Sequence, residues 1–292
     1  MTGKGQTSTK ESLFAVATAR PQGKAPNLIV LVHGCCTNAE KVSEWHTLRN
    51  TTIIDRLKNR YGKDWKKHWE IVVWDWHEST PPPPGVIDNV LLKTYADIAY
   101  GAAENEGLFL ANAIMKHTQH TYDYIHMIGH SAGAKLIDEA AGEFAFRYAF
   151  AKNRPRFVHL TFLDAYTPSE GDKALYGFYS DYAEHYVDRS LGSAFAPTDV
   201  CLSHAFNFDI SRWSHSPTES WTLGHHWPIH WYQNSVTSTS PKFKYGYTLS
   251  LEGSNDRFDE LATLHPPGKQ CGLDTGLFNE NPNPDCQPAT CW

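Results

Sequence analysis

The chain has 292 residues, with 26 Lys and Arg against 32 Asp and Glu, and a formal net charge of −6 at pH 7. This mild acidity argues against a strongly basic nucleic-acid binder, and the hydrophobic content of 41% excludes wholesale disorder. The longest clear apolar run, residues 28–32, is far shorter than the roughly 20 residues that span a bilayer. We therefore expect a soluble chain with no transmembrane segment and no nucleic-acid partner.

Apolar runs typical of buried strands alternate with segments of helical periodicity. The strand-like runs are residues 27–32, 70–74, 124–128 and 157–163, and the helical segments are 38–60, 94–117 and the stretch after Gly133. This alternation predicts an α/β fold, with a mostly parallel central sheet and helices on both faces. In such folds, functional residues gather at the carboxyl ends of the strands.

The end of the chain differs from the rest in composition. We expect one domain over residues 1–265 and a Cys- and Pro-rich tail, 266–292, packed on it. Three of the six cysteines lie in this polar tail, at Cys271, Cys286 and Cys291, so disulfides would hold it better than packing, with reduced thiols as the alternative. Disulfides favour a secreted or extracytoplasmic location. The opening residues carry no apolar signal segment, so we expect that a signal is missing from this sequence, with a cytoplasmic location as the alternative.

The sharpest motif is the run Gly129-His130-Ser131-Ala132-Gly133. It follows a predicted strand and precedes a predicted helix, which is the context of a G-x-S-x-G nucleophile elbow. The glycines are needed there because a side chain two residues before or after the serine would collide across the sharp turn. Ser131 is therefore the candidate nucleophile, and an ordinary helix N-cap serine is the alternative.

A second candidate element follows the strand over residues 28–32. That strand ends in His33-Gly34, and the next backbone N–H, from Cys35, is placed to donate to an oxyanion together with the N–H of Ala132. Two other roles are open for Cys35: that of a nucleophilic thiol, and that of a packing or disulfide-forming residue.

The candidate acid and base come later in the chain, in the order that this architecture requires. Asp164 ends the apolar run 157–163 and can accept from a histidine Nδ1–H, while a turn or helix cap is its alternative role. Asp181, Asp188 and Asp209 are weaker candidates. His225 is the favoured base and His226 the second choice, because Pro228 predicts the first turn of a helix with His225 in the loop just ahead.

Metal chemistry is not expected at these histidines. His226 and His230 form an H-x-x-x-H pair, but the glutamate of the zinc motif H-E-x-x-H is absent and a proline interrupts the helix. We therefore expect no bound metal and no cofactor.

Together, these motifs resemble the α/β-hydrolase superfamily lipases, and in detail they are similar to the neutral, pancreatic-type lipase group. The resemblance covers roughly residues 27–236, and the matching segments are 31–34, 73–76, 125–134, 163–165 and 231–235. It implies an α/β-hydrolase fold and the catalytic roles already named for Ser131, Asp164 and His225. It also implies an oxyanion hole made by the amides of Cys35 and Ala132.

The sequence also departs from that group. Cys35 and Ala132 stand where larger apolar residues are usual, the segment between Asp164 and His225 holds the single cysteine Cys201, and the appended C-terminal β-sandwich has no counterpart. A disulfide-closed lid and a colipase-type partner are therefore not implied. The resemblance then favours a smaller, lidless lipase or esterase in a single α/β-hydrolase catalytic domain.

The substrate is predicted less sharply than the reaction. Four aromatic residues near the expected site could line an acyl groove, although a place in the core is favoured for any single one of them: Trp76, Tyr166, Trp213 and Trp227. We expect a monomer acting on acylglycerol-type or related esters, with transient contact to a lipid interface. The alternatives are a cutinase-like or aromatic-ester hydrolase and a catalytically silent, hydrolase-like binding protein.

Overall fold

The computed structural model describes residues 21–35, 45, 47–76, 89–117, 121–168, 175–188, 198, 200–211, 221–237, 246–253 and 270–272. Its centre is a parallel sheet in the spatial order β2-β1-β3-β4-β5-β6-β7. The strands are β1 (Asn27–Val32), β2 (Trp69–Trp74), β3 (Tyr124–His130), β4 (Val158–Leu163), β5 (Tyr182–Val187), β6 (Phe206–Asp209) and β7 (Gln270–Gly272). The predicted α/β fold with a parallel sheet is confirmed.

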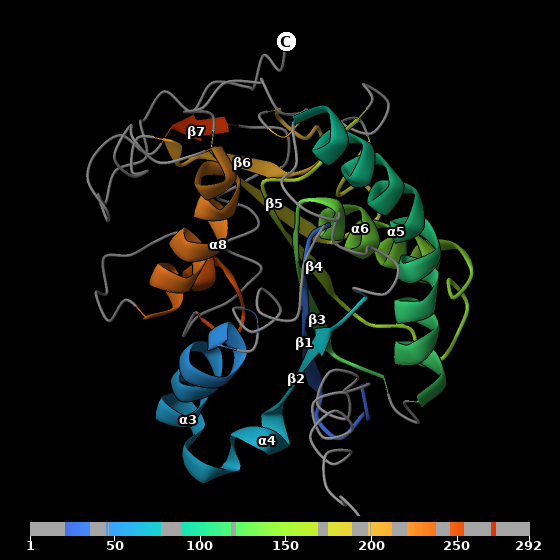
Figure 1. Ribbon diagram of the computed structural model, residues 1–292. Coiled ribbons are helices and arrows are strands. Elements are labelled where there is room, and N and C mark those ends of the chain that lie inside the picture. The colour runs from blue at the N-terminus through green and yellow to red at the C-terminus, as the bar shows by residue number, and fades with distance from the viewer. Residues whose placement is uncertain are drawn as a thin grey trace, which may run out of the picture.

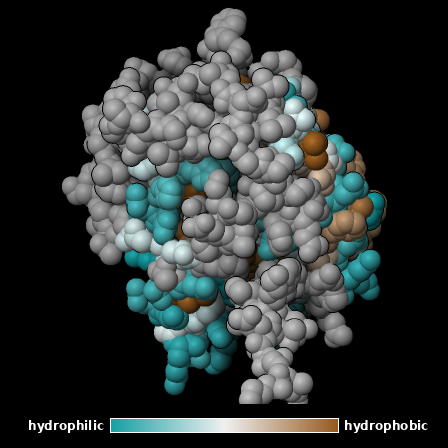
Figure 2. Space-filling model, viewed as in Figure 1, coloured by the Kyte–Doolittle hydropathy of each residue, from teal (hydrophilic) through white to brown (hydrophobic). Residues whose placement is uncertain are grey.

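Helices cover both faces of this sheet (Figure 1). On one face lie α5 (Asn89–His117) and α6 (Ala132–Phe146), and on the other lie α3 (Ile54–Tyr61) and α8 (Trp221–Thr237). Shorter elements are the π-helix η1 (Leu48–Ile53), the 3-10 helices η2 (Gly62–Asp64) and η5 (Gly246–Leu249), and α4 (Trp65–His68). Hydrophilic side chains coat α3 and α4 at the lower left of Figure 2, where Lys58 pairs with Asp55 and Lys67 with Asp64.

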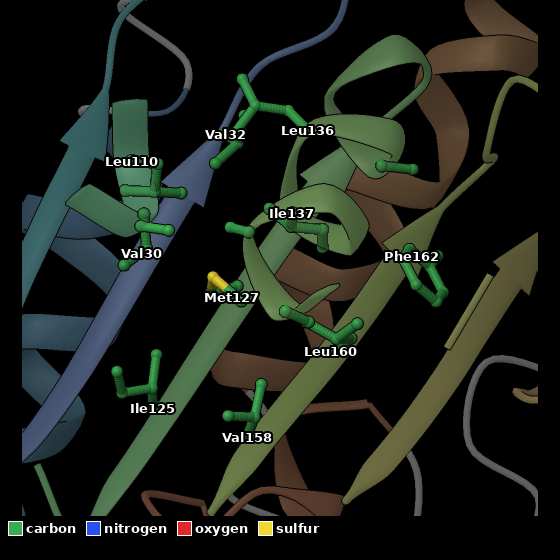
Figure 3. Close-up of a cluster of buried hydrophobic side chains, with 14 of the residues drawn as sticks. Val30, Val32, Leu110, Ile125, Met127, Leu136, Ile137, Val158, Leu160 and Phe162 are labelled. Atoms are coloured by element: carbon green, nitrogen blue, oxygen red, sulfur yellow. The ribbon is translucent and has the colours of Figure 1, made fainter. Parts of the chain in front are cut away.

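The strands divide their side chains between two cores because successive residues point to opposite faces. Val30 and Met127 pack with Leu136 of α6 and Leu110 of α5 (Figure 3). Ile29 joins the opposite core, which includes side chains of η1, α3 and α8. Because both faces are covered, the central strands can be almost wholly apolar, as their sequences predict.

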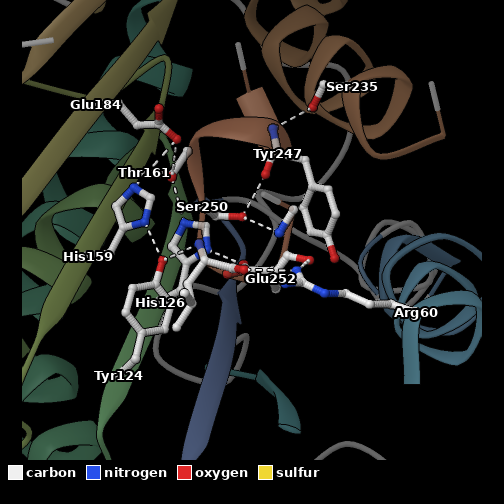
Figure 4. Close-up of polar contacts among 12 residues, drawn as sticks. Arg60, Tyr124, His126, His159, Thr161, Glu184, Ser235, Tyr247, Ser250 and Glu252 are labelled. Atoms are coloured by element: carbon white, nitrogen blue, oxygen red, sulfur yellow. Dashed lines mark hydrogen bonds and ion pairs between the residues drawn. The ribbon is translucent and has the colours of Figure 1, made fainter. Parts of the chain in front are cut away.

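The second face also holds a buried polar cluster, which Figure 4 shows. His126 of β3 pairs with the carboxylate of Glu252 through Nδ1, and its Nε2 lies 2.7 Å from Thr161 Oγ1 on β4. Thr161 donates to Glu184 Oε1 of β5 at 2.8 Å. Tyr186 donates to the other oxygen of that carboxyl at 2.8 Å. Burial raises the pKa of Glu184 to about 8.

The chain that follows α8 returns to cover this cluster. Gly246 N–H donates to the hydroxyl of Tyr186 at 2.6 Å, and Leu251 N–H lies 3.4 Å from the hydroxyl of Tyr124. Arg60 Nη1 donates to the carbonyls of Leu251 and Glu252 at 3.1 Å each. Residues 246–253 therefore form a cover over β3, β4 and β5, since buried polar groups require partners of this kind.

The predictions of disulfides and of no transmembrane segment can be compared with the structure only within the described residues. Among those residues no disulfide is formed, with Cys35 half-buried and Cys201 buried. Apart from residues 270–272 of β7, the predicted tail lies outside the described part, so its disulfides stay a prediction. Within the described chain, no helix is both long and apolar enough to cross a bilayer.

Candidate active site

Ser131 occupies the sharp turn between β3 and α6. Its backbone has φ 54° and ψ −125°, a strained conformation for a residue with a side chain. The turn is tied to the next strand, because Ser131 N–H donates to the carbonyl of Leu163 at 3.0 Å. Tyr166 N–H in turn donates to the carbonyl of Ser131 at 3.2 Å. The serine therefore sits at the carboxyl end of the sheet, on a backbone fixed by its neighbours.

The two motif glycines permit this turn by close backbone approach. A Cβ at Gly129 would lie 2.5 Å from the carbonyl oxygen of Gly133. A Cβ at Gly133 would overlap the carbonyl oxygen of His33 and lie 2.9 Å from that of Val32. Each overlap involves main-chain atoms, which cannot rotate away as a side chain can. The geometry agrees with the steric reason given for these glycines.

The loop after β1 lies directly against the serine. A Cβ at Gly34 would come 2.8 Å from Ser131 Cβ. Trp76 fixes this loop from behind, because its backbone N–H meets His33 Nε2 at 3.1 Å and its indole N–H donates to the His33 carbonyl at 2.8 Å. Cys35 thus follows a glycine in contact with Ser131, but its role as an oxyanion donor, with Ala132, stays a prediction.

Asp164 directly follows β4 and faces the predicted base. It is 1% exposed and has φ 48°, a backbone region that Asp tolerates better than most residues. Its Oδ2 accepts a 2.5 Å hydrogen bond from His225 Nδ1, and its Oδ1 accepts one of 3.3 Å from Asp188 N–H. Burial holds the pKa of the Asp164 carboxyl above its ordinary value, and the hydrogen bond and charge of His225 oppose that rise.

His185 supports the backbone beside the acid, a role that sequence reasoning missed. Burial lowers the pKa of His185 to about 4, so the ring is neutral near pH 7. Its Nε2 accepts from Ala165 N–H at 3.2 Å, and its Nδ1 lies 3.1 Å from Asn207 Oδ1. One tautomer satisfies both contacts, with the proton on Nδ1. No local motif around His185 could have shown this role.

The position of His225 corrects one prediction. His225 lies within α8, which begins at Trp221, and Pro228 is inside that helix, so the predicted loop before a helix starting near Pro228 is wrong. A proline removes one helical hydrogen bond and bends the helix, but tertiary contacts can carry the helix through it. His225, the favoured candidate, contacts Asp164, whereas the ring of His226 lies 6.1 Å from that of His225 and 5.3 Å from that of His130.

The predicted substrate-contacting aromatics have mixed surroundings. Trp76 is 3% exposed and Tyr166 is 1% exposed, and the Tyr166 hydroxyl donates to Asp97 Oδ1 at 2.6 Å. Trp227 is half-buried against the core beneath α8. Trp213 lies outside the described residues. Contact of any of these rings with substrate stays a prediction.

A cluster that could be taken for a metal site lies elsewhere, in the polar cluster of Figure 4. One ligand atom each of His126, His159 and Glu184 lies within 4.8 Å of the others. However, the two imidazole rings are stacked, with centroids 4.0 Å apart and planes 5° apart. In-plane lone pairs of stacked, parallel rings do not converge on one point, and His126 already contacts Glu252 and Thr161. These residues do not fit a cation as they stand.

Comparisons with known proteins add little to this geometry. No protein-family model matches the chain, and no curated protein matches it. Among solved structures, it is similar to a lipase-esterase related protein from Clostridium acetobutylicum ATCC 824, at 17% identity over 49% of this chain, with a TM-score of 0.21. The match spans 43% of that protein's chain. So distant a likeness carries no functional conclusion, and these comparisons do not support the resemblance to pancreatic-type lipases.

Proposed function

We propose that this chain is a serine carboxylic-ester hydrolase that acts through an acyl-enzyme. The observation that carries the proposal is the 2.5 Å hydrogen bond between Asp164 and His225, residues that are 61 positions apart in the sequence. It lies at the carboxyl end of the sheet, where Ser131 occupies its strained turn. A buried acid bonded to histidine Nδ1 is the arrangement that prepares a histidine to activate a serine.

The first half of the reaction follows from this pairing. With its Nδ1–H held by Asp164, the neutral ring of His225 carries its lone pair on Nε2. Nε2 takes the proton of Ser131 Oγ as that oxygen bonds to the ester carbonyl carbon. The carbonyl oxygen becomes an oxyanion, which the amides of Cys35 and Ala132 would hold, each such donor contributing roughly 3 kcal/mol.

In the second half of the reaction, His225 first donates the proton that it has accepted. The tetrahedral intermediate collapses, the bond to the alkoxy group breaks, and His225 gives its proton to the departing alcohol. Water then attacks the acyl group on Ser131 while His225 accepts a proton from the water. A second collapse frees the carboxylic acid and returns the proton to Ser131.

Acylglycerol-type or related esters are the proposed substrates, with transient contact to a lipid interface by a monomeric enzyme. The resemblance of the motifs to lipases supports this choice of substrate. Cutinase-like and aromatic-ester hydrolysis stay as alternatives, to be separated by a panel of p-nitrophenyl and glycerol esters of different chain length. A rate jump above substrate solubility would favour a lipase, and a preference for short soluble esters an esterase.

A catalytically silent binding protein is the second candidate, because Ser131 is only 3% exposed. A fluorophosphonate probe separates the two candidates, since it labels an activated serine and not a blocked one. In the active case, Ser131→Ala should lower kcat for p-nitrophenyl butyrate by more than about 10⁴-fold and abolish labelling. Ser180→Ala, remote from the site, is the matched control. Unlabelled wild-type protein that hydrolyses no ester would reject the enzyme proposal.

A further inference from the structure

His130, the variable residue of the serine motif, touches the part of the chain that carries the candidate base. It is the last residue of β3 and is 4% exposed. Its Nε2–H donates to the backbone carbonyl of His225 at 2.8 Å. The two rings are also in contact, with centroids 4.5 Å apart. The residue before the candidate nucleophile is therefore hydrogen-bonded directly to the residue that would activate it.

The backbone of His225 lies where a helix needs outside support. Pro228 has no N–H to donate, so the carbonyl four residues earlier, at residue 224, loses its helical donor, and the proline ring crowds that turn of α8. His225 stands three residues before the proline, and its carbonyl accepts from His130. Asp164 holds the ring of His225 at Nδ1, and His130 holds its main chain. Two hydrogen bonds from two neighbouring strands thus fix the residue.

The same ring also borders the loop after β1. A Cβ built at Gly34 would lie 2.8 Å from His130 Nδ1, so this imidazole fills the space beside that glycine. Gly34 directly precedes Cys35, the candidate oxyanion donor. His130 is thereby in contact with the base and the oxyanion loop, and it is covalently joined to Ser131.

We propose that His130 is a positioning residue, which sets the distance and angle between the imidazole of His225 and the hydroxyl of Ser131. The proposal rests on the proposed function. Its physical basis is that proton transfer requires reacting atoms at hydrogen-bond distance, so that a misplacement of about 1 Å costs about 10²-fold in rate. In this role His130 acts through the backbone and ring of His225 and exchanges no proton itself.

The test compares three substitutions at this position. His130→Gln keeps a donor N–H at about the reach of Nε2, His130→Phe keeps a flat ring without a donor, and His130→Asn carries an amide too short to reach the His225 carbonyl. We expect kcat for p-nitrophenyl butyrate to fall about 10- to 100-fold in the Phe and Asn variants, with KM within about twofold. The Gln variant should stay within about fivefold of the wild type. His204→Phe, away from the site, is the matched control.

Two results would overturn the role. One is a folded Phe or Asn variant with wild-type kcat, and the other is a Gln variant as slow as the Phe variant. Thermal unfolding identifies variants that are folded, and the Asn variant keeps the test open if the larger Phe ring cannot be accommodated.

A measurement independent of turnover separates this proposal from the proposed function. The His225 Nδ1–H proton, in its short bond to Asp164, should give a low-field proton NMR signal. It should shift or broaden in the Phe and Asn variants and persist in the Gln variant. If wild-type protein hydrolyses no ester but its signal responds in this way, the function fails while the positioning contact stands. An unchanged signal in all variants would overturn the contact.

Discussion

Replacing Gly133 with alanine tests the close approach of α6 to β1. The new Cβ would overlap the carbonyl oxygen of His33 and lie 2.9 Å from that of Val32, so the helix and the strand must separate. Such overpacking costs roughly 1–3 kcal/mol. The separation also weakens the 2.8 Å indole hydrogen bond of Trp76 to the His33 carbonyl, by about 1 kcal/mol. Alanine regains about 1 kcal/mol of helix propensity. We therefore expect a net loss of about 1–3 kcal/mol in the free energy of unfolding.

Gly101 supplies the matched control. It lies in α5, and a Cβ built there meets nothing within 4 Å, so Gly101→Ala should raise the free energy of unfolding by about 0.5–1 kcal/mol. Equilibrium urea unfolding followed by tryptophan fluorescence would measure both variants. The midpoints should move in opposite directions, and the Gly133 variant should also hydrolyse esters more slowly because the loop after β1 is displaced. A Gly133→Ala protein as stable as the wild type would refute the argument.

Three further outcomes are expected. Asp164→Asn should lower kcat by about 10⁴-fold with the fold intact on circular dichroism, because Asn tolerates positive φ but cannot hold His225 in the required tautomer; a kcat above a tenth of wild type would contradict this. Trp76→Phe should cost about 1–3 kcal/mol in urea unfolding, since the buried His33 carbonyl loses its indole donor; an unchanged midpoint would speak against it. Glu184 has a pKa raised from 4.5 to about 8, so the folded state holds a proton that the unfolded state releases. Its contribution to stability is therefore complete below pH 4.5 and is lost as the pH rises through 8. Compared with the wild type, Glu184→Gln should show a smaller fall in the free energy of unfolding between pH 5 and pH 8. Equal slopes of the free energy of unfolding against pH in the two proteins would count against the assignment.

The first four strands, β1 to β4, were predictable from sequence, and the later strands β5, β6 and β7 were not. The expected run 27–32 coincides with β1, because its aliphatic residues are covered on both faces. In β5, Glu184 and His185 are wholly buried, and the strand therefore lacks an apolar pattern. Their burial depends on Thr161, Asn207 and other partners far away in the sequence. The pattern of apolar residues in a short segment does not indicate partners that are distant in the sequence, so β5 and β6 were not predicted.

The residues of the candidate site also differ in how well the sequence alone predicts them. Ser131 and Asp164 follow apolar strands, so each could be singled out from its immediate neighbours. His225 was one of sixteen histidines, and it was chosen by chain order and by a helix start at Pro228 that the structure contradicts. Its contact with Asp164 could be found only from the fold. His130 was visible only as the variable position of a motif. Its hydrogen bond depends on where α8 places the His225 carbonyl, 95 residues later.

The cover formed by residues 246–253 has a consequence for the growing polypeptide. When β3, β4 and β5 have left the ribosome, Glu252 has not yet been made, so His126 and its neighbours stay hydrated, without the carboxylate that later meets them. Chains grow at about 5–20 residues per second. The more than sixty residues from the end of β5 to Glu252 thus impose a delay of several seconds, during which this side of the nascent sheet is open to chaperones.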